Sequence, residues 1–284
     1  MERWIEETLH GGFRVRLKAD RVLFDSETEH QHLVIFENAD FGRVMMLDGV
    51  VQLSTRDEFV YHEMMAHVPL FAHGKAKRVL IVGGGDGGVL REVLKHPEVK
   101  SATLCEIDRS VIDLAREHFP DVSAGAFDDN RTHVVIADGT KFVRETDERF
   151  DMIMVDSTDP IGPGAVLFTK EFYTDSRGAL SPGGILVTQN GLPFLQASEL
   201  KQSVGYFRDL FDDAFAYLAT TPSYFGGSMS FGWATDDKEL RQHDLETIER
   251  RYREAGHFAT RYWRPDMQRA AFALPTYIRE LVET

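Results

Sequence analysis

Acidic side chains follow the apolar runs of this sequence with a regularity that suggests a shared site. Asp86 and Glu106 follow the first two apolar runs after residue 77, Asp138 follows the third, and Asp156 and Asp159 follow the fourth. In open α/β sheets, ligands bind beyond the carboxyl ends of the strands. We therefore expect the five acids to line one crevice. Because their motifs contain no basic partner, they call for a cationic ligand or a metal ion.

A glycine-rich turn surrounds the first of these acids. The segment Gly83–Gly88 fits the G-x-G-x-x-G pattern between a strand and a helix. Glu106 lies about 20 residues further on, where an acid can accept hydrogen bonds from both ribose hydroxyls. Together they predict a nucleoside ligand, with a turn used only for packing as the alternative. Asp86 would repel a pyrophosphate at about 4 Å by roughly 4 kcal/mol, which favours a positively charged nucleoside over NAD.

Two further acidic motifs extend the predicted crevice. Asp138 could accept a hydrogen bond from an adenine amine with the Gly139 backbone close by, or it could simply cap the following helix. The loop 156–164 carries two acids, and Pro160 and Pro163 would fix their positions. An Asx turn without chemistry is the alternative for this loop. Two acids in this one loop are more than a single turn needs, which favours the binding interpretation.

A metal site is not predicted. Carboxylates suit Mg²⁺ or Ca²⁺, but these acids come from separate strand ends, as separate ligand contacts would. The segment HEMMAH resembles a zinc motif, yet His62 and His67 are one residue too far apart for the i, i+4 spacing that places two histidines on one helix face.

The elements that must position these residues fall into two groups. Residues 1–72 are expected to form an N-terminal β domain with a bridging helix: strands at 14–17, 21–25, 33–37, 43–47 and 50–53, a hairpin turn at Asp48-Gly49, and a helix at 56–71. Residues 73–284 are expected to form the catalytic domain, with strands at 78–82, 101–105, 133–137, 150–155 and 185–188, helices at 89–95, 110–118, 170–180 and 198–211, and late, antiparallel strands at 215–219 and 229–234. Apolar strands that alternate with helices predict a parallel sheet covered on both faces. The predicted fold class is α/β, with a Rossmann-like, methyltransferase-type sheet preceded by a small β domain.

The composition and net charge of the chain limit the classes of partner that it could bind. The 284 residues are 43% hydrophobic and 27% charged, with a net charge of −14, which excludes a disordered chain and argues against binding of nucleic acid. The single cysteine, Cys105, excludes an intrachain disulfide and fits a reducing compartment. No apolar run approaches the roughly 20 residues of a membrane span, and the first ten residues lack the apolar core of a signal peptide. We expect a cytoplasmic protein that does not bind membranes.

Nearly the whole chain resembles the polyamine aminopropyltransferases, the family of the spermidine synthases. The motifs that carry the resemblance are WIEETLH, ENADFGRVMMLDGVVQ, RDEFVYHEMMAHVPL, VLIVGGGDGGVLREV, CEID, ADG, DSTDPIGP, LFTKEFY, TQNG, PSYFGG and RAAFALP. The family implies transfer of an aminopropyl group from decarboxylated S-adenosylmethionine to putrescine, which gives spermidine and 5′-methylthioadenosine. It implies no cofactor, since the donor is a co-substrate, and a homodimer or homotetramer.

The resemblance also implies roles for single residues. Asp156 would be the catalytic base and Asp159 a ligand of the acceptor amine. The other implied contacts are Asp86 and His62 to the donor amine or the polyamine, Glu106 to the ribose, Asp138 and Gly139 to adenine, Gln31 and Gln52 to the nucleoside or amine, Pro163 to the nucleoside, Tyr61, Gln189 and Tyr224 along the amine channel, and Trp4 as a lid-like aromatic. From residue type alone, His62, Gln52 and Trp4 are better interpreted as core or interface residues.

Several alternatives stay open at this point. Thr158, Ser223 and Phe225 depart from the family pattern, and so does the segment Gly191–Phe194, which leaves cadaverine, agmatine or spermidine as other acceptors. A methyltransferase that uses intact S-adenosylmethionine would bring a methionine carboxylate against Asp86. A non-catalytic polyamine-binding protein would need the acids but no nucleoside site.

Overall fold

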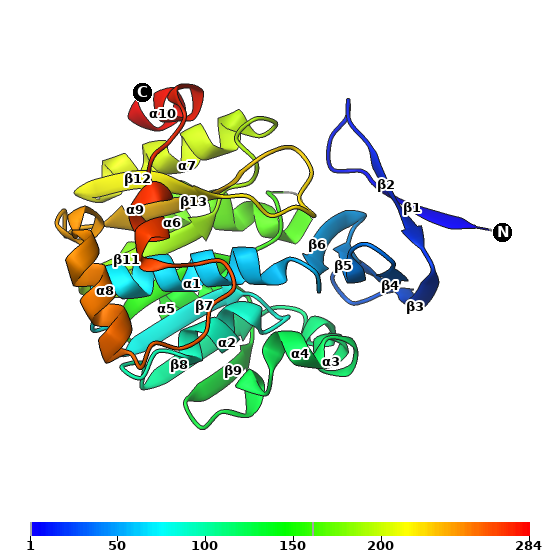
Figure 1. Cartoon of the computed structure of the whole chain (residues 1–284), viewed down its shortest axis with the longest axis horizontal. Helices are drawn as coiled ribbons and strands as arrows, with labels where there is room; N and C mark the ends of the chain where they lie inside the picture. Colours follow the sequence, from blue (N-terminus) through cyan, green and yellow to red (C-terminus); the bar gives the residue numbers. More distant parts are fainter. Residues whose placement is uncertain (1, 161) are drawn as a thin grey trace.

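The computed structural model describes residues 2–160 and 162–284, and two antiparallel sheets open the chain. Strands β1 (Arg3–Glu7) and β2 (Val15–Ala19) form a two-stranded ribbon, whereas β3 (Arg21–Glu27), β4 (His32–Asn38), β5 (Gly42–Leu47) and β6 (Val50–Ser54) form a four-stranded sheet. Asp48 and Gly49 connect β5 to β6 with φ angles of 47° and 75°, which are the left-handed conformations that a two-residue hairpin requires. The sequence pattern missed β1. This N-terminal region lies to one side of the larger sheet (Figure 1).

Helix α1 (Glu58–His73) leads from the N-terminal sheets into the rest of the molecule. Every residue of α1 except Phe59 is buried, so the helix has no solvent-facing stripe. It packs against α2 and against strands β10 and β11 of the large sheet. The helix ends at Gly74, which adopts a φ of 76° and donates its N–H to the Leu70 carbonyl. Tyr61 and His62 are thereby held in the interior of the protein.

A seven-stranded sheet forms the centre of the molecule, in the order β12-β13-β11-β10-β7-β8-β9. Its strands are β7 (Arg78–Gly83), β8 (Ser101–Glu106), β9 (Thr132–Ile136), β10 (Phe150–Asp156), β11 (Leu180–Gln189), β12 (Asp213–Ala219) and β13 (Met229–Thr235). The strands β7 to β11 are parallel, and β13 is antiparallel to both β11 and β12. The predicted α/β class is confirmed, including the late antiparallel strands.

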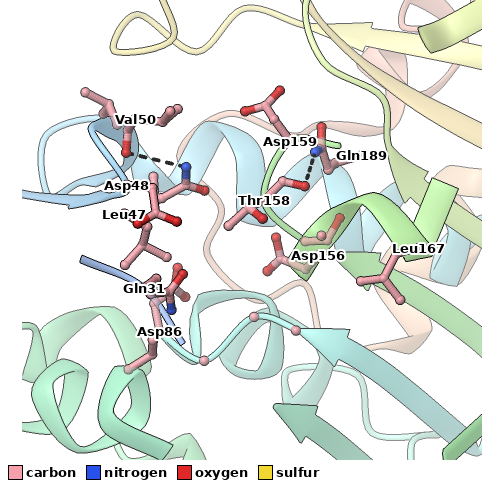
Figure 2. Close-up of a pocket in the computed structure, with 18 of the residues that line it drawn as sticks. Gln31, Leu47, Asp48, Val50, Asp86, Asp156, Thr158, Asp159, Leu167 and Gln189 are labelled. Carbon is pink, nitrogen blue, oxygen red and sulfur yellow. Dashed lines mark hydrogen bonds between the residues drawn. The ribbon is translucent and has the colours of Figure 1, made fainter. Parts of the chain in front are cut away.

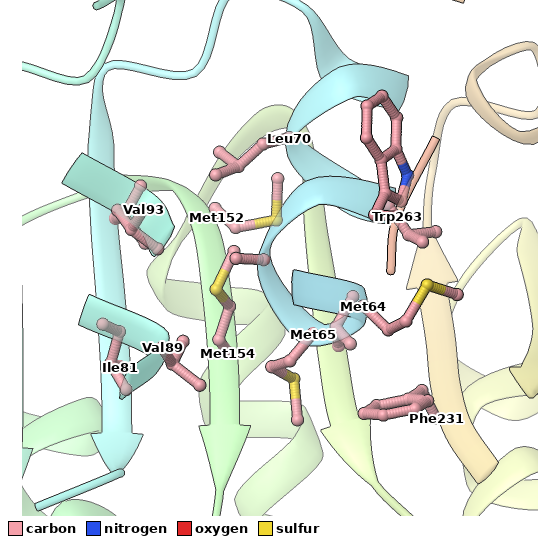
Figure 3. Packing of buried hydrophobic residues seen from close by; sticks show 14 of the residues in the cluster. Met64, Met65, Leu70, Ile81, Val89, Val93, Met152, Met154, Phe231 and Trp263 are labelled. Carbon is pink, nitrogen blue, oxygen red and sulfur yellow. The ribbon is translucent and has the colours of Figure 1, made fainter. Parts of the chain in front are cut away.

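Helices cover both faces of this sheet. One face packs against α1, α2 (Gly88–Leu94) and α8 (Leu245–Glu254), and the other packs against α5 (Gly139–Glu145), α6 (Lys170–Ala179), α7 (Ala197–Leu210) and α10 (Thr276–Glu283). The remaining helices are α3 (Arg109–His118), α4 (Pro120–Ser123), α9 (Pro265–Ala270) and three short 3-10 turns, Ala126–Asp128, Gly162–Phe168 and Leu240–Gln242. Methionines of α1 and β10 fill the space between helix and sheet, next to Trp263 (Figure 3).

The parallel strands end at a common edge, which explains why their acids meet. Asp156 at the end of β10 is in register with Gly83 at the end of β7, and Glu106 at the end of β8 is in register with Ile136 of β9. The loops that follow these strands therefore start side by side.

Among the described residues, no helix combines the length and apolar character needed to cross a bilayer.

Candidate active site

A pocket of about 540 Å³ opens at this edge, between the large sheet and the N-terminal sheets. Such a volume suits a nucleoside together with a small amine. All five acids predicted to line one crevice do so, and the other predicted residues in the pocket wall are Gln31, Gln52, Tyr61, His62, Gly139, Gln189 and Tyr224. Asp156, Thr158, Asp159 and Gln189 lie on one side, across from Gln31, Leu47 and Asp48 (Figure 2). The side chain of Pro163 lies outside what the structure describes.

The glycine turn lets β7 approach two of the acids. Gly83 has a φ of 82°, and a Cβ there would lie 2.1 Å from the Asp156 carbonyl oxygen. A Cβ on Gly85 would lie 2.9 Å from Glu106 Oε2. A side chain at Gly83 would displace the turn from the β10 backbone, and one at Gly85 would collide with the Glu106 carboxylate. The glycines therefore allow the turn to lie close to both strand ends.

Glu106 lines the pocket at the end of β8. Its Oε1 accepts the Asp108 N–H at 2.9 Å, and burial raises its pKa to about 7. Asp108, which the sequence analysis missed, caps α3 through Ser110 and also accepts hydrogen bonds from Thr28 and Gln31. The Gln31 amide therefore ties the N-terminal sheet to the start of α3, beside Glu106. The signal for Asp108 was its place as the last residue of the CEID motif, two positions after Glu106.

The alternative for Asp138, a helix cap, is part of its role. Its Oδ1 accepts the Thr140 N–H at 2.8 Å, the Thr140 hydroxyl at 2.6 Å and the Lys141 N–H at 3.4 Å. All three contacts use one oxygen, and Oδ2 makes no hydrogen bond within the described part of the chain. A Cβ on Gly139 would lie 2.5 Å from Val82 Cγ1, so this glycine lets α5 start close to β7.

Asp156 has one oxygen that is hydrogen-bonded and one that is buried without a partner among the described residues. Its Oδ1 accepts the Tyr61 hydroxyl at 2.8 Å. Its Oδ2 is buried and has no hydrogen-bond partner among the described residues. Burial, with a contribution from the Asp86 charge, raises the pKa of Asp156 to about 6. Burial also raises the pKa of Tyr61 well above its usual range, so that hydroxyl stays a donor.

Asp86 has a basic partner that its own motif does not contain. His62 Nε2 lies 3.5 Å from Asp86 Oδ2, and the Gly88 N–H donates to Asp86 Oδ1 at 2.6 Å. Burial opposes ionisation of Asp86, but His62 and this N–H outweigh it and lower its pKa. The motif of Asp86 thus contains no basic partner, but packing of α1 onto α2 brings His62 to it from another motif.

Asp159 lies at the end of the pocket away from Glu106. Its Oδ1 accepts the Gln196 amide at 2.5 Å, and the same amide donates to Glu199 at 2.9 Å. Burial raises the pKa of Asp159. Glu7 of the β1–β2 ribbon also lines the pocket, accepts the Val51 N–H at 3.1 Å and has a pKa raised by burial and by Asp159. Sequence reasoning named neither Glu7 nor Gln196, although Glu7 belongs to the WIEETLH motif.

Gln189 and Tyr224 line the pocket, but their polar atoms already have partners. Gln189 donates to the Thr158 carbonyl at 3.1 Å and accepts the Gly191 N–H at 2.8 Å. The Tyr224 hydroxyl donates to the Gln52 carbonyl at 2.7 Å. Both side chains therefore hold the acidic loop and β6 in place and present carbon surface to the pocket.

The positions that depart from the family pattern have clear surroundings. Ser223 is buried and donates its N–H and hydroxyl to Asp57, at 2.6 Å and 3.0 Å. Phe225 lines the pocket and packs edge-to-face on Phe41, with ring centroids 5.7 Å apart. Trp4 is 48% exposed on the β1–β2 ribbon and lies outside the pocket wall. Residues 2–160 and 162–284 contain no cluster of His, Cys, Asp and Glu side chains with the arrangement of a metal site.

Solved structures share this architecture over its full extent. A spermidine synthase in complex with the transition-state analogue AdoDATO is 37% identical, with a TM-score of 0.93, and the alignment covers 100% of this chain and 97% of that one. The spermidine synthase from Thermotoga maritima is 37% identical, with a TM-score of 0.91 and coverage of 100% and 96%. The fold and the pocket thus define a Rossmann-like transferase of the spermidine synthase type.

Sequence comparison gives the family. The spermine/spermidine synthase domain model matches residues 58–244, and the spermidine synthase tetramerisation domain model matches residues 3–55. A polyamine aminopropyltransferase of Ruegeria sp. (strain TM1040) is 52% identical over 99% of this chain and 98% of its own length. Polyamine aminopropyltransferase 1 of Pseudomonas aeruginosa is 53% identical over 98% of this chain and 96% of its own. The chain belongs to the polyamine aminopropyltransferase (spermine/spermidine synthase) family.

Proposed function

We propose that this enzyme transfers the aminopropyl group of decarboxylated S-adenosylmethionine to putrescine, giving spermidine and 5′-methylthioadenosine. One observation carries the proposal: the free, buried Oδ2 of Asp156 faces a pocket whose wall also contains Glu106, Asp138 and Asp86. A base thus stands between a site suited to a nucleoside and a site suited to an amine. The reaction proceeds in polyamine biosynthesis, and the cytoplasmic location stays a prediction.

The donor binds along the glycine edge. The Glu106 carboxylate accepts the ribose hydroxyls, and the free Oδ2 of Asp138 accepts the adenine amine. The Asp86 carboxylate then lies beside the primary ammonium of the aminopropyl arm. Intact S-adenosylmethionine would bring a carboxylate to this position, so the ionised Asp86 favours the decarboxylated donor over a methyl donor.

The chemistry needs a neutral amine in line with an activated carbon. The donor sulfonium activates the CH₂ of the aminopropyl arm that is bonded to sulfur, and the amine nitrogen forms a bond to this carbon while the carbon–sulfur bond breaks. The electron pair leaves with sulfur, which becomes the neutral thioether of 5′-methylthioadenosine. The proton of the attacking ammonium passes to Asp156 Oδ2. This displacement accounts for every bond and proton without a metal ion or a covalent enzyme intermediate.

The base is matched to this task. An alkyl ammonium has a pKa of about 10, and its deprotonation near pH 7.5 costs roughly 4 kcal/mol. Asp156, with a pKa of about 6, is ionised at that pH and still a stronger base than an exposed aspartate. Tyr61 holds the other oxygen, which orients Oδ2 toward the amine. Positioning of the two substrates supplies much of the remaining acceleration.

The distal ammonium of the acceptor would lie beside a second pair of acidic residues, Asp159 and Glu7. Asp159 and Glu7 line the pocket beyond Asp156, and Gln189 and Tyr224 shape its wall. A diamine would leave its second ammonium beside these two carboxylates. The match of residues 3–55 to a tetramerisation domain supports a homo-oligomer, a tetramer or a dimer.

Product identification tests this proposal. The protein is incubated with decarboxylated S-adenosylmethionine and, in separate reactions, putrescine, cadaverine, agmatine or spermidine, and the products are identified by mass spectrometry. We expect spermidine and 5′-methylthioadenosine from putrescine as the fastest reaction. A faster reaction with another amine would replace the acceptor, and methyl transfer from intact S-adenosylmethionine would replace the reaction.

A further inference from the structure

A line of buried charges leads from Asp86 away from the pocket. His62 Nε2 lies 3.5 Å from Asp86, and His62 Nδ1 lies 2.6 Å from Glu58 Oε2. The Arg91 guanidinium in turn donates to Glu58 at 2.9 Å. The side chains of His62, Glu58 and Arg91 are 3%, 8% and 14% exposed. Negative and positive groups thus alternate along the line.

The histidine in this line has no freedom to turn. Each ring nitrogen faces a carboxylate, so both can act as donors only in the imidazolium form. A Cβ on Gly88 would lie 2.2 Å from His62 ring atoms, so the first residue of α2 bounds the ring on one side. Burial disfavours the charge, but Asp86 and Glu58 outweigh burial and raise the pKa of His62 to about 10.

The histidine charge matters because two carboxylates share the pocket wall here. Asp86 raises the pKa of Asp156, whereas His62 lowers the pKa of both acids. Without a cation, two buried carboxylates of this kind take up a proton between them near neutral pH. A protonated Asp86 would not attract an ammonium, and a protonated Asp156 would not act as a base.

We propose that Glu58, anchored by Arg91, is a positioning residue for the reaction: it holds the His62 ring against Asp86 and thereby keeps Asp86 ionised and oriented toward the donor's ammonium. This inference rests on the function proposed above. The groups that face the line are Tyr61 and Glu58 from α1, Asp86 from the glycine turn, Arg91 and Glu92 from α2, Asp156 from β10 and Tyr224 from the late loop.

Two ligands that differ by the aminopropyl arm, with its ammonium, and by the sulfonium charge test the proposal. Binding of decarboxylated S-adenosylmethionine and of 5′-methylthioadenosine, which lacks the aminopropyl arm, is measured by calorimetry for wild type and Glu58→Gln. We expect the donor affinity of the variant to fall about tenfold or more, with the thioadenosine affinity within about twofold of wild type. Equal losses for both ligands, or no loss for either, would overturn the inference.

Glu63→Gln is the matched control. Glu63 is buried on the same helix but accepts the backbone N–H groups of Arg261, Tyr262 and Trp263. Its substitution should lower the melting temperature and leave the ratio of the two affinities unchanged. If Glu63→Gln changes the ratio as much as Glu58→Gln does, the ratio reports general loosening of α1, and the inference fails.

A second variant controls for misfolding, and a double-mutant cycle tests whether Glu58 acts through Asp86. Removal of one partner of a buried ion pair is strongly destabilising, so Glu58→Gln is also made together with Arg91→Met, which removes both charges. The selective loss of donor affinity should persist, and a wild-type ratio in this variant would refute the role of Glu58. In a cycle with Asp86→Asn, the two losses should not add, because both act on one contact.

The pH profile gives an independent readout. The acid limb of kcat/KM for putrescine, measured at saturating donor so that Glu106 is already ionised, reports ionisation of Asp156 and should lie near pH 6 in wild type. It should move up by about one pH unit in Glu58→Gln, and an unshifted limb would contradict the inference. If wild type itself makes no spermidine, the proposed function fails. If wild type is active and the variants keep the wild-type ratio, only this inference fails.

Discussion

Nucleoside binding should release a proton from Glu106. Burial raises its pKa from an ordinary value of 4.5 to about 7, so the free enzyme carries a proton there in about half of the molecules at pH 7. Ribose hydroxyls donate to an ionised carboxylate and thereby favour the charged form. The expected release is about nine-tenths of a proton at pH 6, about half at pH 7 and about one-tenth at pH 8.

Calorimetry measures this release directly. Binding of 5′-methylthioadenosine at pH 6 is followed in two buffers with different ionisation enthalpies, because the difference in heat gives the number of protons released. The ligand has no ammonium, so it leaves Asp86 and Asp156 without a new charge. Glu106→Gln should bind more weakly and show no buffer dependence. A wild-type release below about one-tenth of a proton at pH 6, or an equal release by the variant, would refute the assignment.

The same carboxyl should limit the stability of the free enzyme at alkaline pH. The folded-state pKa of Glu106 lies above its unfolded value, so its favourable contribution is complete below pH 4.5 and is lost as the pH rises through about 7. The shift corresponds to at most about 3 kcal/mol. Glu106→Gln should therefore gain free energy of unfolding relative to wild type between pH 5 and pH 8, measured by denaturant titration. A constant difference across this range would contradict the prediction.

Three further predictions concern the acceptor, the late loop and metals. Putrescine should exceed cadaverine by about tenfold or more in kcat/KM, and n-butylamine should be far poorer, because Asp159 and Glu7 fix the distal ammonium and a shift of about 1 Å in the attacking nitrogen is costly; steady-state kinetics with equal or better turnover of cadaverine would refute this. Ser223→Ala should lose about 1–3 kcal/mol of stability in denaturant titrations, since Asp57 loses a buried hydrogen bond, whereas Ser223→Thr should keep most of it. Activity should survive EDTA, and full loss restored by one divalent ion would show a metal requirement.

Much of the candidate site could be predicted because it depends on strand ends. Glu106, Asp138 and Asp156 each follow a strongly apolar run, and parallel strands end at one edge of the sheet. Their shared location therefore follows from local pattern and a general rule of topology. The roles of the glycines also follow from sequence, since only a residue without a side chain allows β7 to approach Asp156 and Glu106 so closely.

The rest depends on contacts between elements far apart in sequence. Glu7 reaches the pocket only because the β1–β2 ribbon folds against β6, and β1 is too short and too polar to be recognised as a strand. His62 becomes the partner of Asp86 only when α1 packs against α2. For Gln189, the sequence gives the side chain but not which of its atoms are free, and the structure shows both engaged. Ser223, one of the departures from the family pattern, still has a hydroxyl, which donates a hydrogen bond to Asp57.

A single isosteric substitution separates the role of Asp156 as the base from its role in shaping the pocket. Asp156→Asn keeps the shape of the side chain and the Tyr61 contact but removes the charge that accepts the proton. With decarboxylated S-adenosylmethionine and putrescine, kcat should fall by about 10²- to 10⁴-fold, while the donor affinity measured by calorimetry stays within about threefold of wild type. A kcat within about threefold of wild type would rule out Asp156 as the base.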